Sequence, residues 1–165
     1  MLRFHNYSIV FQEVPDELTL AINLTNCPHR CKGCHSPHLQ ENAGEFLTEE
    51  VLEALLAKYD KTISCICFMG GDGEAQEVEK SALFIRNKTN DRIKTAWYSG
   101  KDIFPNTCSV LSFDYIKLGA YVEKLGGLDS PTSNQRFYRI ENGEMIDMTY
   151  RFCKTNLSTY RNNSF

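Results

Sequence analysis

The sequence lacks several features that would point to a membrane, an export route or a nucleic acid. It has no apolar run of about 18 residues, so no membrane-spanning helix is expected. Its first residues show neither an apolar segment nor a small-residue cleavage site, so we expect a cytoplasmic protein. Lys and Arg number 18 against 21 Asp and Glu, and this net charge of -3 argues against a nucleic-acid binder. Only 10 Gly and 5 Pro among 165 residues exclude a low-complexity chain, which leaves one soluble globular domain over residues 1–165.

What the sequence does have is cysteine. There are 7 cysteines, an odd number, in a chain without an export signal. Disulfides are rare in reducing compartments, so clustered cysteines there more often serve metal or redox chemistry. Three of them, Cys27, Cys31 and Cys34, lie within eight residues. The other four are Cys65, Cys67, Cys108 and Cys153, of which the first two alternate on an apolar run and are expected to pack in the core.

Strand and helix patterns alternate along most of the chain. Short apolar runs predict strands at 18–24, 62–69, 94–99 and 113–118. Thr48 is a plausible N-cap for a helix with an apolar face from Val51 to Tyr59, and a second helix is expected around 78–85. This order favours a parallel α/β sheet. A complete (β/α)8 barrel needs about 250 residues, so we expect an incomplete TIM-like barrel of parallel strands and helices.

The last part of the chain has a different character. Asn142-Gly143 stands between β-compatible runs at 136–140 and 145–149, which predicts a C-terminal β-hairpin. From about residue 150 the sequence is polar, and a loosely ordered or surface tail is expected there.

The three clustered cysteines have a spacing that suits an iron–sulfur cluster with one open iron. Zinc sites take four ligands, and ferredoxin runs supply a fourth Cys close by; neither pattern is complete here. Three thiolates can instead hold three irons of a 4Fe-4S cluster and leave the fourth to an outside molecule. The alternatives are three unrelated thiols, or a structural zinc site that adds one of His29, His35 or His38 and supports a non-catalytic interaction module.

The Cys27-x3-Cys31-x2-Cys34 loop directly after an early strand resembles the cluster motif of radical S-adenosylmethionine (SAM) enzymes. In that superfamily the open iron binds the amino and carboxylate groups of SAM. One electron from the cluster then cleaves the sulfonium bond and yields a 5'-deoxyadenosyl radical. The resemblance therefore implies two cofactors, a 4Fe-4S cluster and SAM, with the three cysteines as metal ligands.

Further segments resemble the activases of glycyl radical enzymes, in particular those that serve anaerobic ribonucleoside-triphosphate reductase. Gly33 precedes the third Cys, Gly70-Gly71-Asp72 follows a strand, and Ser133-Asn134-Gln135 precedes the hairpin. The family usually has Pro where this chain has Gly73, which leaves open whether Asp72 or Glu74 faces the cofactor. The resemblance implies cofactor contacts from Gly33, Cys34, His35, Gly70, Gly71, Asp72 and Ser99.

The resemblance also implies a function and its partners. The chain would be an oxidoreductase that generates a glycyl radical on the large subunit of the reductase, with a flavodoxin- or ferredoxin-type electron donor. A radical SAM enzyme that acts on a small molecule or a peptide is the alternative within the same superfamily.

Overall fold

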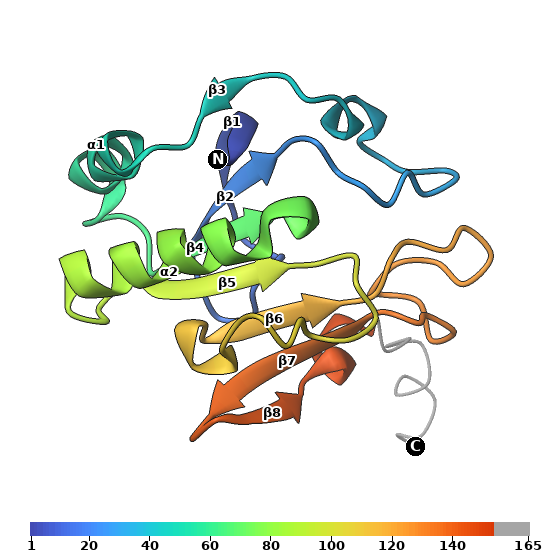
Figure 1. Ribbon diagram of the computed structural model, residues 1–165. Coiled ribbons are helices and arrows are strands. Elements are labelled where there is room, and N and C mark those ends of the chain that lie inside the picture. The colour runs from blue at the N-terminus through green and yellow to red at the C-terminus, as the bar shows by residue number, and fades with distance from the viewer. Residues whose placement is uncertain (154–165) are drawn as a thin grey trace, which may run out of the picture.

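The computed structural model describes residues 1–153, which form one mixed sheet with two α-helices (Figure 1). The strand order is β3-β1-β2-β4-β5-β6-β7-β8. The elements are β1 Arg3–Val10, β2 Thr19–Leu24, β3 Glu45–Phe46, α1 Glu49–Tyr59, β4 Cys65–Met69, α2 Ala75–Thr89, β5 Lys94–Tyr98, β6 Tyr115–Leu118, β7 Arg136–Glu141 and β8 Glu144–Asp147. No helix in this part of the chain is long and apolar enough to cross a membrane.

The centre of the sheet is parallel and its two sides are antiparallel. Strands β2, β4, β5 and β6 pair in parallel, whereas β1 and β3 on one side and β7 and β8 on the other pair antiparallel. The predicted strands, both helices and the C-terminal hairpin are confirmed. The open, partly parallel sheet is consistent with a partial barrel.

Two features of the fold differ from the sequence-based expectation. Strands β1 and β3 were not expected, because β1 reads Arg-Phe-His-Asn-Tyr-Ser and carries little apolar signal before Ile9. The connection from β5 to β6 contains a 3-10 turn at Val110–Ser112 and no α-helix. Residues 154–165 of the expected polar tail lie outside the described residues.

The helix ends follow local chemistry. The Thr48 hydroxyl accepts a hydrogen bond from the Val51 N–H, which caps α1 as predicted, and Leu52, Leu55 and Leu56 turn inward. Helix α2 ends at Asn90, whose φ of 48° is the left-handed conformation that Asn tolerates at helix ends. Each helix therefore ends a few residues before the next strand begins.

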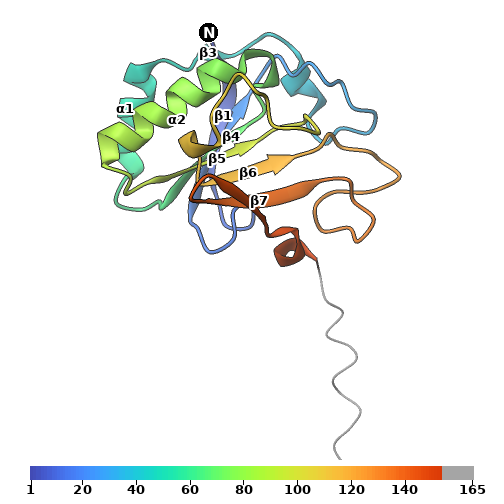
Figure 2. The same ribbon diagram turned by 60° about the horizontal axis from the view of Figure 1, so that its bottom comes forward.

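Both helices cover the same face of the sheet (Figure 2), and each face has a core of its own. On one face Ile22, Phe68, Trp97 and Ile116 pack with the apolar sides of both helices. The opposite face carries smaller side chains, among them Cys65, Cys67 and Ala96, and is closed by Phe137 and by Val14 from the 11–18 turn. Cys65 and Cys67 are thus packing residues, as expected.

Candidate metal centre

The segments that carry the candidate site residues meet at one edge of the sheet. The cysteine loop follows β2, the Gly70-Gly71-Asp72 turn follows β4, and Ser99 follows β5. These are the carboxyl ends of parallel strands, and in Figure 1 they point toward the cysteine loop on the right. In α/β sheets this is the edge at which ligands bind.

All three clustered cysteines line one cavity of about 200 Å³, which we call the thiol cavity. Its floor is formed by Met69 at the end of β4 and Tyr98 at the end of β5. The fold therefore brings the three predicted ligands together against the carboxyl edge of the central strands.

Backbone N–H groups in the cysteine loop are directed at sulfur. Those of His29 and Arg30 donate to the Cys27 thiol and lower its pKa, although burial outweighs them and raises that pKa overall. The Ser36 N–H donates to Cys34 Sγ at 3.4 Å. Arg30, with a φ of 47°, gives the loop a left-handed turn. Donors aimed at sulfur stabilise thiolates, so the loop fits the thiolate ligands that an iron–sulfur cluster requires.

Within residues 1–153, no three His, Cys, Asp or Glu side chains are close enough together to hold one metal ion. The histidines of the zinc alternative have other contacts. His29 Nε2 lies 2.9 Å from Asp72 Oδ2, the His35 ring packs on Tyr121, and the His38 ring packs on His5. None of these three histidines is among the residues that line the thiol cavity.

Asp72 connects three of the loops at this edge. It is 5% exposed and accepts hydrogen bonds from the Gly100 N–H at 2.8 Å and from the Ser99 hydroxyl, in addition to its contact with His29. The contact with His29 joins the cysteine loop to the turn after β4. Glu74, the other candidate carboxylate, contacts the amino group of Met1.

The glycines of the turn allow close packing of backbone. Gly71 has a φ of 86°, and a Cβ there would lie 2.6 Å from the Val78 side chain and 2.7 Å from that of Leu24. Gly70, with a φ of 99°, borders the thiol cavity, and its carbonyl accepts from the Trp97 indole at 2.7 Å. Only glycine fits both requirements at position 71.

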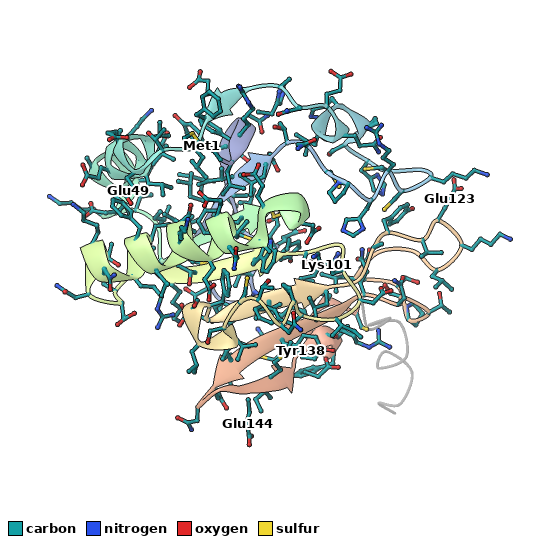
Figure 3. The ribbon with its side chains drawn as sticks, in the orientation of Figure 1. Met1, Glu49, Lys101, Glu123, Tyr138 and Glu144 are labelled. Atoms are coloured by element: carbon teal, nitrogen blue, oxygen red, sulfur yellow. The ribbon has the colours of Figure 1, made fainter. Side chains whose placement is uncertain are left out.

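The remaining predicted residues lie on either side of the cavity. Ser99 is fully buried, and its hydroxyl donates to the Asp72 carboxylate and accepts from the Lys101 N–H. Gly33 has a φ of 74° and packs against the Glu123 side chain, which Figure 3 labels beside the cysteine loop. His35 faces Tyr121 from the neighbouring loop. The cysteine loop is therefore supported by residues 121–123.

Sequence reasoning missed Lys117. Four residues, Asn23, Met69, Tyr98 and Lys117, pair in register across β2, β4, β5 and β6. They form one row on the face opposite the two helices, which we call the inner face. Lys117 is 7% exposed, and burial lowers its pKa to about 8 against the opposing effects of Asp72 and Cys31. A lone lysine inside the apolar run 115–118 is the signal that could have identified it.

Comparison with known families matches residues 18–109 to the 4Fe-4S single cluster domain. The chain belongs to this family. A 4Fe-4S single cluster domain is typical of radical SAM activases, and the match spans the cysteine loop, the Gly70-Gly71-Asp72 turn and Ser99. The comparisons with curated proteins and with solved structures gave no match. The family therefore indicates an iron–sulfur cluster and radical SAM chemistry, whereas none of the three comparisons identifies the target of that chemistry.

Proposed function

We propose that this 4Fe-4S single cluster domain protein is a radical SAM activase that generates a glycyl radical on anaerobic ribonucleoside-triphosphate reductase. The observation that carries the proposal is the thiol cavity, in which Cys27, Cys31 and Cys34 converge at the carboxyl edge of the parallel strands. When bound there, the cluster supplies the electron that cleaves SAM to methionine and a 5'-deoxyadenosyl radical.

The residues around the cavity suit the amino-acid part of SAM. Lys117 offers a buried ammonium group and Asp72 a buried carboxylate at the same edge of the sheet. A ligand that carries both a carboxylate and an ammonium group is complementary to such a pair. Asp72 already accepts from three donors, so a ligand ammonium would replace His29, a side chain that is partly exposed and comes from the cysteine loop.

Two further features support a protein substrate and an external electron donor. The sheet is open rather than closed into a barrel, which leaves lateral access to its inner face. Arg30 and Lys32 are exposed on the cysteine loop and suit contact with an acidic flavodoxin- or ferredoxin-type donor.

The first test is the metal content of the anaerobically purified protein. We expect about four irons per chain and reductive cleavage of SAM, because three thiolates and one open iron complete a 4Fe-4S cluster. Replacement of Cys27, Cys31 or Cys34 by Ser is expected to abolish both. Cys153→Ser is the matched control, since Cys153 is exposed and lies outside the thiol cavity. Retained cleavage in any one of the three loop variants would contradict the ligand assignment.

The second test addresses the target. After the reduced protein and SAM are mixed with the reductase, electron paramagnetic resonance should detect a glycyl radical on the reductase. SAM cleavage without that radical would favour the alternative of a small-molecule or peptide substrate.

A further inference from the structure

One hydrogen bond joins the loop that carries the three candidate metal ligands to the turn that carries the buried carboxylate. His29 stands between Cys27 and Cys31 in the chain, and its Nε2 lies 2.9 Å from Asp72 Oδ2. The side chain of Asp72 is 1% exposed, whereas that of His29 is 24% exposed. The imidazole therefore lies between the carboxylate and solvent, and a ligand that takes this oxygen displaces it.

The imidazole also fits closely against the sheet edge. A Cβ at Gly100 would lie 2.6 Å from His29 Cδ2, so the ring packs directly on the backbone after β5. The Gly100 N–H donates to the same Asp72 oxygen at 2.8 Å, and the Ser99 hydroxyl donates to the other oxygen. The Ser99 N–H in turn donates to the Lys117 carbonyl, which fixes these two donors to the sheet. His29 is therefore the donor that can leave without a change in the sheet.

The backbone around His29 needs contacts that hold it in place. Asn26 and Arg30, on either side of His29, have φ values of 60° and 47°. Residues other than glycine adopt this left-handed conformation at a cost in free energy. At its start the loop backbone donates to carbonyls of the 39–41 segment. Further along, the bond from His29 to Asp72 holds the loop to the carboxyl edge of the sheet.

The same carboxylate oxygen is the acceptor that the amino group of SAM would use. An oxygen of a carboxylate has two acceptor positions, and on Asp72 Oδ2 both are taken, by His29 and by Gly100. A ligand that binds only the molecules from which His29 has moved binds with an affinity lowered by that fraction. SAM bound to the cluster and to Asp72 would itself join the two segments that His29 joins in its absence.

We propose that His29 is a positioning residue that holds the cysteine loop on Asp72 until SAM arrives and then gives up its place to the amino group of SAM. The inference rests on the proposed function, because it takes SAM as the ligand. It adds a competition, since the contact that holds the loop before SAM binds also lowers the affinity for SAM. Removal of the imidazole therefore has two effects of opposite kind, tighter binding of SAM and a looser loop.

Isothermal titration calorimetry of the anaerobically purified holoprotein measures the first effect. With the cluster oxidised no electron is supplied, so SAM binds without cleavage. We expect His29→Ala to lower the Kd of SAM about tenfold, which corresponds to one hydrogen bond to a charged group. His29→Gln should keep the wild-type Kd, because its amide N–H reaches the position of the imidazole Nε2. The probe 5'-methylthioadenosine lacks the amino-acid part of SAM and should bind the wild type and His29→Ala equally.

The rate at which bathophenanthroline removes iron from the SAM-free holoprotein measures the second effect. We expect this rate to rise about tenfold in His29→Ala, because loss of the same contact raises the open population of the loop by the same factor. His29→Gln should lose iron at the wild-type rate. His38→Ala is the matched control, since His38 is exposed and its ring packs on His5, away from the turn after β4. It should change neither the Kd nor the rate.

Two results would overturn the inference while SAM binds to the wild type. One is an unchanged or weaker affinity of His29→Ala for SAM, and the other is an equal gain in affinity for 5'-methylthioadenosine. If His29→Ala does not retain its iron, His29→Asn takes its place, because this amide is one methylene too short to reach Asp72. A wild-type protein that does not bind SAM would contradict the proposed function as well, so the two failures are distinguishable.

Discussion

At the scale of single residues, the site combines one cation and one anion, both buried. The Lys117 ammonium donates a hydrogen bond to the Gly119 carbonyl at 2.6 Å, and the Asp72 carboxylate accepts from three donors. Burying a lysine in a sheet costs stability, because the charged form loses its hydration. Such a residue at the carboxyl edge of a sheet is more easily explained by ligand binding than by folding.

Replacement of Lys117 by Met tests this cost through pH. The pKa of Lys117 is about 8 in the folded protein and 10.5 when unperturbed, so protonation favours the unfolded chain below pH 8. The penalty is largest below pH 8, falls steadily as the pH rises from 8 to 10.5, and is absent above 10.5. We therefore expect the free energy of unfolding of the wild type, relative to that of Lys117→Met, to increase by about 2 kcal/mol between pH 7.5 and pH 10.

Urea denaturation of both proteins at the two pH values measures the difference. Tyrosines and cysteines that also titrate in this range cancel in the comparison, because both proteins contain them. Parallel pH profiles would show that Lys117 is not a buried cation.

At the scale of elements, the turn between β4 and α2 sets the position of the Asp72 carboxylate. Gly71 is left-handed and packed against Val78 and Leu24, whereas a Cβ added at Gly73, two residues on, would have its nearest contact, the Asn26 carbonyl oxygen, at 4.0 Å. Substitution of these two glycines by alanine therefore distinguishes the steric demands of the turn at Gly71 from the general effect of adding a methyl group.

We expect Gly71→Ala to lower the free energy of unfolding by about 2–4 kcal/mol, from left-handed strain and from overpacking. Gly73→Ala should change it by less than about 1 kcal/mol. Chemical denaturation measures both, and equal losses in the two variants would contradict the geometry of the turn.

The same turn shows what sequence could and could not predict. The strand before it and the helix after it follow from apolar runs, and Gly-Gly-Asp indicated a turn near a ligand. The three donors to Asp72 come from 27 to 43 residues away in the chain, and no local pattern reveals contacts at that distance. The inner row ending at Lys117 depends on strand register, which a sequence does not contain.

At the scale of the whole molecule, the fold is a sheet that does not close, and the 11–18 turn covers part of its inner face. Val14 packs with Cys65 and Cys67 in the hydrophobic cluster of the inner face, which we call the inner core. Glu17, from the same turn, is also buried. The Glu17 carboxylate accepts from the Ser64 hydroxyl at 2.6 Å, from the Tyr115 hydroxyl at 2.9 Å and from Lys94. Burial and this carboxylate raise the pKa of Tyr115 to about 12.

Because Glu17 joins the turn to three different strands or strand ends, Glu17→Gln should release the turn and expose the inner core. An amide keeps one acceptor but directs a donor at groups that themselves donate, and a buried mismatch of this kind costs about 2 kcal/mol. That value corresponds to an increase of about 30-fold in the open population. Alkylation of Cys65 and Cys67 by iodoacetamide, followed by mass spectrometry, should accelerate accordingly.

Glu53→Gln serves as the control, because Glu53 also pairs with a lysine, Lys88, but is half exposed on α1. It should leave the alkylation rate of Cys65 and Cys67 unchanged. If Glu17→Gln also leaves that rate unchanged, the 11–18 turn is held by its other contacts, among them the burial of Val14 and the Arg151–Asp16 pair. If the rate rises, the cover that the 11–18 turn places over Cys65 and Cys67 depends on one buried carboxylate. In that case the turn, and not a further strand, closes this part of the open sheet.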